Sequence, residues 1–282
     1  MPETQAFSAP RSSWTPPSGT LGELVRASHS RASDLLPQYD ALRLAAETAP
    51  ATVSLRQALL QPTVGVIAEV KRRSPSKGSI NPGLDALSKA RSYADAGAAA
   101  VSVLTEPDRF GGSIADLRSV ASGVSVPVLR KDFIVAPVQL YEARANGAAA
   151  ALLIVRALSD AALSELVEAG SAIGLELLVE VRDAVELERA LGAGATVIGV
   201  NNRNLESLVI DSGTVERILP LIPRDVVAIA ESGMASRADV QRAARAGADA
   251  VLIGSAVSAV DDAGEMVRSF TGVVVERDAR PN

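Results

Sequence analysis

The sequence contains no cysteine and a single histidine, His29, and these two shortages remove several kinds of functional site. Without cysteine the chain has no disulfide, no thiolate metal site and no cysteine nucleophile. One histidine excludes a metal site built from several imidazoles. Metal sites of these two kinds are therefore excluded, and we interpret His29 as a surface residue.

Aromatic residues are also scarce, at 3% of the 282 residues, whereas 48% of the chain is hydrophobic. The apolar content is mostly Ala, Val, Leu and Ile, which suits β-branched strands covered by Ala- and Leu-rich helices. No apolar run reaches the ~18 residues of a membrane span, and the N-terminus lacks the pattern of a signal peptide. A net charge of −5 gives no reason to expect nucleic acid or an anionic membrane as a partner. We therefore expect a cytoplasmic protein.

From Val64 onward the chain repeats a helical stretch, a Gly-Ala turn and a short apolar run. The glycines, of which Gly97, Gly147 and Gly247 are the clearest, suit the position just after a helix. The apolar runs suit parallel strands that are buried on both faces. Eight such runs lie near residues 64–70, 99–104, 126–130, 150–155, 175–180, 196–200, 226–230 and 249–253.

Eight near-equal units predict an α/β protein with a single (β/α)8 barrel. The alternative is an open doubly wound sheet, but the chain has no dinucleotide-type glycine fingerprint. We predict a flexible N-terminal tail over residues 1–20, a helical extension over 21–62, the barrel over 63–272 and a C-terminal tail over 273–282.

Charged residues mark the ends of the odd-numbered predicted strands. Catalytic groups of a barrel lie at the C-terminal strand ends, and side chains from alternate strands share a layer. The charged residues of this set are Glu69, Lys71, Lys131, Glu180 and Glu231. Because an unpaired buried charge costs several kcal/mol, we expect these five to meet and to pair. The alternative is that each one caps its strand and faces water. Arg130 and Asp132 have the opposite parity and are expected to face the helices or loops.

Two short loops suit a phosphate group. Barrels often bind phosphate after the seventh and eighth strands, where this chain has Ser232-Gly233 and Gly254-Ser255. Glycine lets backbone N–H groups approach an anion, and serine adds a hydroxyl donor. The basic loop at residues 72–79 could close over such a ligand. We therefore predict a small phosphate-bearing substrate.

At this point the motifs resemble the indole-3-glycerol phosphate synthase family of tryptophan biosynthesis. The first is Glu-Val-Lys-Arg-Arg-Ser-Pro-Ser-Lys-Gly at residues 69–78. The other matching segments follow in order at 102–106, 110–113, 127–133, 152–155, 179–181, 198–205 and 230–233. The resemblance implies a carboxy-lyase (EC 4.1.1.48) that acts on 1-(2-carboxyphenylamino)-1-deoxyribulose 5-phosphate. It would close the indole ring with loss of CO2 and water, without metal or cofactor. Transient association with other tryptophan-pathway enzymes is compatible with it.

The resemblance also implies roles for individual residues. Lys131 would be the general acid and Glu180 the general base, and Lys71 would bind the substrate carboxylate and shuttle a proton. Glu69 and Glu231 would orient these groups, and Asn201 would hold a hydroxyl of an intermediate. The anthranilate pocket would be lined by Ser74, Pro75, Phe110, Phe133 and Arg203, and the phosphate would be held by Ser232, Gly233, Gly254 and Ser255. We expect neighbouring positive charge and burial to lower the pKa of Lys131 toward neutrality.

The chain departs from the family pattern in three places. Residues 27–31 (Ala-Ser-His-Ser-Arg) replace a basic stretch that resembles Lys-Arg-x-Glu, residues 81–85 replace an acidic and aromatic run, and Arg182 stands where histidine is common. One alternative function is another phosphate-binding barrel, such as a sugar-phosphate lyase or phosphoribosylanthranilate isomerase, although the latter typically uses a cysteine that this chain lacks. Another is a non-catalytic relative that only binds the ligand.

Overall fold

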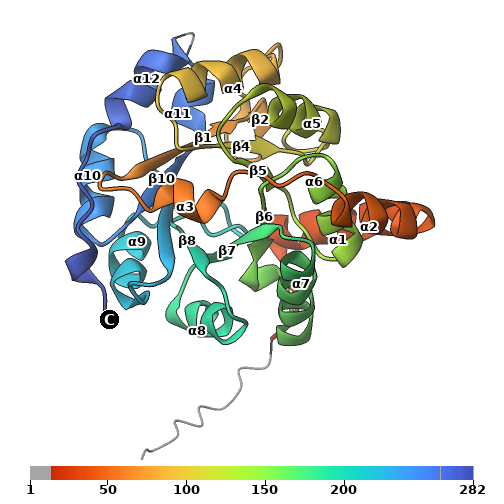
Figure 1. Cartoon of the computed structure of the whole chain (residues 1–282). Helices are drawn as coiled ribbons and strands as arrows, with labels where there is room; N and C mark the ends of the chain where they lie inside the picture. The colour runs from red at the N-terminus through yellow and green to blue at the C-terminus, as the bar shows by residue number, and fades with distance from the viewer. Residues whose placement is uncertain (1–13, 261, 282) are drawn as a thin grey trace, which may run out of the picture.

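Eight parallel strands close into a barrel in the order β1-β10-β9-β8-β7-β6-β5-β4, and helices surround it (Figure 1). The structure, a computed structural model, describes residues 14–260 and 262–281. The barrel strands are β1 (Gly65–Val70), β4 (Ala100–Leu104), β5 (Val128–Lys131), β6 (Ala150–Ile154), β7 (Glu176–Val181), β8 (Val197–Asn201), β9 (Val227–Glu231) and β10 (Ala250–Ile253). The predicted (β/α)8 barrel is therefore confirmed, and the open sheet is excluded by the pairing of β1 with both β4 and β10.

The strands form where the apolar runs predicted them, because side chains on both of their faces are buried. The helices outside the barrel are α4 (Ala86–Asp95), α5 (Ile114–Gly123), α6 (Pro137–Ala145), α7 (Asp160–Ala172), α8 (Ala184–Gly192), α9 (Gly213–Ile218), α10 (Arg237–Arg245), α11 (Ser255–Ser258) and α12 (Ala263–Phe270). Gly97, Gly147 and Gly247 follow helices with φ of +91°, +85° and +97°, a conformation that glycine adopts without strain. This geometry explains the repeated Gly-Ala turn.

The helical extension consists of α1 (Gly19–Leu35), α2 (Tyr39–Glu47) and α3 (Leu55–Leu59). The extension was predicted, and it is present. α3 lies at the N-terminal ends of the strands, where Ser54 donates a hydrogen bond to Glu176 at the start of β7 (2.6 Å). Trp14 Nε1 donates to the carbonyl of Arg156 (3.1 Å), so the described part of the predicted tail contacts the barrel. The rest of that tail, residues 1–13, lies outside the described residues.

The C-terminal segment binds the base of the barrel. The backbone of Val64 donates to Val273 (2.7 Å), and Val275 donates to Pro62 (3.1 Å). The Arg280 side chain is buried, pairs with Asp249 at 2.8 Å, and also donates to the carbonyl of Val226, just before β9. Residues 273–281, which we predict to be a tail, are thus fixed beneath the strands by ion pairs and backbone bonds. In the part of the chain that the structure describes, no helix is long and apolar enough to cross a membrane.

Candidate active site

A cavity of about 290 Å³ opens at the C-terminal ends of the barrel strands. All the candidate residues predicted from the sequence line it: Glu69, Lys71, Ser74, Pro75, Phe110, Lys131, Phe133, Glu180, Asn201, Arg203, Glu231, Ser232, Gly233, Gly254 and Ser255. They come from seven of the eight strands or the loops that follow them, because the ends of parallel strands meet at one rim.

The five charged residues from the odd-numbered strands converge in this cavity. Lys71 Nζ lies 2.7 Å from Glu69 Oε1, and Lys131 Nζ lies 3.9 Å from Glu69 Oε2. Lys131 Nζ also lies 3.9 Å from Glu231 Oε2, and Glu69, Glu180 and Glu231 are all buried. The alternative in which each charge caps its strand and faces water is therefore wrong. The Arg130 side chain is buried behind this layer against α6, as its parity predicted, whereas Asp132 pairs with Arg130 but also lines the cavity.

Lys131 is held in its charged form. Burial opposes the charge, but the negative charges of Glu69, Glu231 and Glu180 outweigh burial and raise the pKa of Lys131 above its usual value. The expected lowering of this pKa toward neutrality is therefore wrong. The expectation counted burial and the second lysine, whereas three carboxylates face the Lys131 ammonium.

The carboxylates differ from one another in charge. Burial and the negative charge of Glu180 raise the pKa of Glu231 to about 8, against the opposing effect of Lys131. Burial also acts to raise the pKa of Glu69, but Lys71 and Lys131 overcome it, so that the Glu69 pKa is lowered. Glu231 thus holds a proton near neutral pH, while Glu69 stays ionised between the two lysines. Glu180 Oε2 and Glu231 Oε1 are buried and have no hydrogen-bond partner among the described residues.

Two glycines leave room for this cluster. A Cβ atom at Gly254 would lie 2.3 Å from Glu69 Oε1 and 2.7 Å from Lys71 Nζ. A Cβ atom at Gly199 would lie 2.0 Å from Glu231 Oε1. Both contacts are far below van der Waals distance, so any side chain at these positions would displace a buried carboxylate. Gly254 was predicted as a phosphate ligand, whereas sequence reasoning missed Gly199, whose only signal is a glycine inside a strand.

One wall of the cavity is aromatic. Phe110, after β4, and Phe133, after β5, have ring centroids 5.9 Å apart at an angle of 38°. β4 and β5 are neighbouring strands, so these two loops lie side by side. An apolar wall of this kind suits a planar aromatic group of a ligand.

The Ser-Gly loops lie elsewhere on the rim. β9 and β10 are neighbouring strands, and β1 separates them from β4 on one side of the ring. Ser232 and Gly233 both have positive φ, of 61° and 82°, and Asn202 Nδ2 donates to the Ser232 carbonyl (3.0 Å). Asn202 thereby fixes a tight turn in an unusual conformation beside the cavity.

Sequence reasoning missed several apolar lining residues. They are Leu24 of α1, Leu208 and Ile210 after β8, and Met234 after β9. Leu208 has φ of 63°, which is rare for a non-glycine residue. The local sequence around these residues carries no motif, and they reach the cavity only because loops and α1 fold over the rim. Among the described residues, no group of His, Cys, Asp and Glu side chains has the arrangement of a metal site.

Comparisons with known proteins agree with this geometry. The family model described as indole-3-glycerol phosphate synthase matches residues 25–270. Indole-3-glycerol phosphate synthase of Rhodococcus jostii is 48% identical over 223 residues, which cover 79% of this chain and 83% of the relative. The protein of the same name from a Nocardioides species is 54% identical over 208 residues, which cover 74% of this chain and 80% of the relative.

A solved structure shares the fold at low sequence identity. The 3-hexulose-6-phosphate synthase of Salmonella typhimurium aligns with a TM-score of 0.60 at 15% identity, and the match covers 73% of this chain and 96% of that one. This likeness supports the barrel alone. The extent of the family match and the identity to the curated relatives show that the chain belongs to the indole-3-glycerol phosphate synthase family.

Proposed function

We propose that this chain converts 1-(2-carboxyphenylamino)-1-deoxyribulose 5-phosphate into indole-3-glycerol phosphate, CO2 and water, as a carboxy-lyase of tryptophan biosynthesis. The observation that carries the proposal is the position of Lys131, a charged ammonium set among three buried glutamate side chains in the cavity. The reaction needs acid, base and charge stabilisation, and side chains of this cluster can supply all three. It needs no metal or organic cofactor.

The cavity has a matching wall for each end of the substrate. The carboxyphenyl ring would pack against Phe110 and Phe133, with Ser74, Pro75 and Arg203 around it. Lys71 would bind the ring carboxylate through its ammonium group. The phosphate would bind to the loops of Ser232, Gly233, Gly254 and Ser255, on another part of the rim. A substrate held at both ends has its ketone near the charged cluster, which favours the bent conformation that ring closure requires.

Ring closure is the step that Lys131 serves. The aryl carbon that bears the carboxylate attacks the ketone carbon, and the ketone oxygen becomes an alkoxide that takes a proton from Lys131. The raised pKa of Lys131 keeps this proton in place at neutral pH. An alkoxide is a stronger base than a lysine amine, so transfer remains favourable as the charge develops.

Decarboxylation and dehydration follow. The carboxylate leaves as CO2, and the electron pair of the broken bond restores the aromatic ring. The new hydroxyl then leaves as water with a proton from Lys71, which the departing carboxylate has released, while Glu180 removes a proton from the adjacent carbon. Glu231 would orient Glu180 and Lys131, Glu69 would orient the two lysines, and Asn201 would hold the hydroxyl of the intermediate. Two protons are given and one is taken, so the cycle consumes one proton.

The test is turnover by the purified protein, followed by indole fluorescence. We expect product from the wild type, and no turnover from Lys131→Met, which should still bind substrate in calorimetry. Folded wild-type protein that forms no product would refute the activity, and near wild-type turnover by Lys131→Met would refute the role of Lys131. Supplying phosphoribosylanthranilate to the same protein tests the isomerase alternative.

The setting of the reaction is part of the same proposal. We place it in the cytoplasm, with transient association with other tryptophan-pathway enzymes. The negative net charge is consistent with a protein that binds neither nucleic acid nor an anionic membrane. Cross-linking in intact cells, followed by identification of the linked proteins, would test the association.

A further inference from the structure

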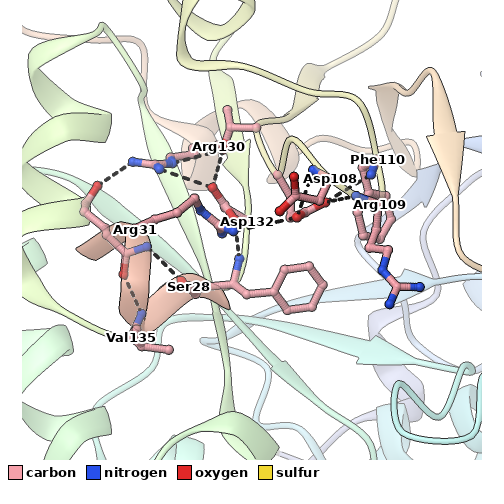
Figure 2. Close-up of polar contacts among 12 residues, drawn as sticks. Ser28, Arg31, Asp108, Arg109, Phe110, Arg130, Asp132 and Val135 are labelled. Atoms are coloured by element: carbon pink, nitrogen blue, oxygen red, sulfur yellow. Dashed lines mark hydrogen bonds and ion pairs between the residues drawn. The ribbon is translucent and has the colours of Figure 1, made fainter. Parts of the chain in front are cut away.

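Two buried carboxylates stand behind the aromatic wall and hold its backbone. Glu106 accepts hydrogen bonds from the backbone N–H groups of Asp108 (3.2 Å), Arg109 (2.7 Å) and Phe110 (3.0 Å). Asp132 accepts from the backbone N–H of Phe133 (2.8 Å). Figure 2 draws these hydrogen bonds as dashed lines, with Asp108, Arg109 and Phe110 close together on one side of Asp132. Each carboxylate therefore fixes the backbone from which one ring of the wall projects.

Arg31 of α1 joins the two carboxylates. Its Nη2 atom donates to Asp132 Oδ1 at 2.9 Å, and its Nη1 atom lies 3.7 Å from Glu106 Oε1. The Glu106 side chain is fully buried, and Arg31 is its one ion-pair partner among the described residues. Asp132 has a second cation, Arg130, at 3.2 Å. The pKa of Asp132, which burial alone would raise, is lowered by Arg130 and Arg31 together with its hydrogen bonds.

Ser28, one turn before Arg31, binds the same wall from the same helix. Its Oγ donates to the carbonyl of Phe133 and accepts from Gln139 Nε2 at 2.9 Å. α1 therefore holds both polar groups of the Phe133 backbone, the carbonyl directly and the N–H through Asp132. Leu24, four residues before Ser28, lines the cavity itself. Positions separated by three or four residues share a helix face, so one face of α1 builds and braces the aromatic wall.

We propose that Arg31 is a positioning residue for the aromatic part of the substrate. It ties α1 to the loops of Phe110 and Phe133 and fixes the width of the pocket between them. The inference rests on the proposed function, since it assigns this pocket to the carboxyphenyl ring. Removing the guanidinium leaves Glu106 buried without a cation, which favours movement of its loop toward water. The Ser-Gly loops after β9 and β10 have no bond to this network, so phosphate binding should be independent of it.

The experiment separates the two ends of the ligand by using anthranilate and inorganic phosphate as individual probes. In Arg31→Gln we expect the dissociation constant for anthranilate and the KM for substrate to rise about tenfold, because loosened binding appears in KM when the acid and base are unchanged. The phosphate dissociation constant should not change, and kcat should stay within about threefold. Arg31→Lys keeps the charge but has one nitrogen in place of two, so it should restore part of the anthranilate affinity that Arg31→Gln loses.

Arg109→Gln is the matched control. Arg109 also links a rim loop to α1, through an ion pair with Glu23 at 2.8 Å, but both side chains are more than half exposed. Exposed pairs contribute little, so this variant should bind both probes as the wild type does. Ser28→Ala keeps the ion pairs and should weaken anthranilate binding by about threefold through loss of one hydrogen bond. If Arg31→Gln does not fold, the anthranilate affinity of Ser28→Ala provides the test in its place.

Three outcomes would overturn the proposal: unchanged anthranilate binding in folded Arg31→Gln, equal loss of anthranilate and phosphate binding, or an equal effect of Arg109→Gln. If Arg31→Gln does not fold, unchanged anthranilate binding in Ser28→Ala overturns it as well. Because the probe measurements require no turnover, they also separate this inference from the proposed activity. A wild type without turnover whose anthranilate binding depends on Arg31 would refute the activity and support the positioning role.

Discussion

Replacing Gly199 with alanine adds one methyl group to the most crowded point of the charged cluster. The new Cβ atom would lie 2.0 Å from Glu231 Oε1, whereas ordinary contact begins near 3.4 Å, so the carboxylate must move by about 1.4 Å. Glu231 is buried and lies 3.9 Å from Lys131, and Glu180 lies close enough to shift its pKa. The movement therefore disturbs both the proposed acid, Lys131, and the proposed base, Glu180. Overpacking of this kind costs about 1–3 kcal/mol of stability, and a misplacement of ~1 Å can reduce turnover about 100-fold.

Two measurements test Gly199→Ala. We expect kcat for indole-3-glycerol phosphate formation to fall about 100-fold, and the free energy of unfolding in urea to fall by about 1–3 kcal/mol. The control is Gly192→Ala at the end of α8, where an added Cβ atom meets no heavy atom within 4 Å and where φ is not positive. It should be neutral or slightly stabilising, since alanine favours helix more than glycine does. A Gly199→Ala enzyme with wild-type kcat and stability would show that the cluster has free space and would refute the argument.

The remaining predictions concern charge. Lys131→Met should bind substrate without turning it over, as measured by calorimetry and fluorescence. The folded chain raises the pKa of Glu231 from its ordinary value of 4.5 to about 8, so the folded state binds this proton more tightly than the unfolded state between these pH values. Its contribution to stability is therefore fully present below about pH 4.5 and is lost as the pH rises toward about 8. Urea unfolding from pH 5 to 8 should show a weaker decline in Glu231→Gln than in the wild type, and parallel curves would contradict the assignment. Arg280→Ala removes one partner of a fully buried ion pair with Asp249 and should lower the free energy of unfolding by about 3–5 kcal/mol, with kcat unchanged. A stability loss below about 1 kcal/mol would show that Arg277, the other partner of Asp249, is enough by itself to fix the C-terminal segment beneath the barrel.

The barrel could be predicted from the sequence because its signals are local. A buried apolar run of four to six residues predicts a strand of a parallel sheet, several of the runs here follow a Gly-Ala turn, and eight runs at near-equal spacing predict a barrel. The meeting of Glu69, Lys131 and Glu231 followed from the same logic. The position of a residue within its strand can be read from the sequence, and residues at matching positions of alternate strands lie in one layer of the barrel even when they are far apart along the chain.

The contacts that the sequence could not predict are made by segments that fold over the cavity or beneath the barrel strands. Arg31 lies on a helix outside the barrel, and no pattern within α1 indicates that its partner is Asp132, 101 residues away. Arg280 is similar, since a charged residue near a chain end is usually exposed, yet this one is buried beneath the strands. Both contacts form between segments whose relative positions are set by the complete tertiary fold.

The pKa of Lys131 shows where prediction by residue type fails even when every residue is placed correctly. Burial alone would discharge a lysine, and a second lysine nearby would add to that effect. The pKa of Lys131 is raised and not lowered because Glu69, Glu180 and Glu231 all act on its ammonium group. The positive charge of Lys71 is paired with Glu69 at 2.7 Å. The proposed catalysis by Lys131 therefore differs from catalysis by a lysine whose pKa lies near neutral pH. In the proposed mechanism Lys131 stays charged as the acid, and the alkoxide that would form in ring closure is basic enough to take its proton. The pH dependence of turnover near neutrality should therefore reflect the carboxyl groups around Lys131, and Glu231 foremost, rather than the lysine itself.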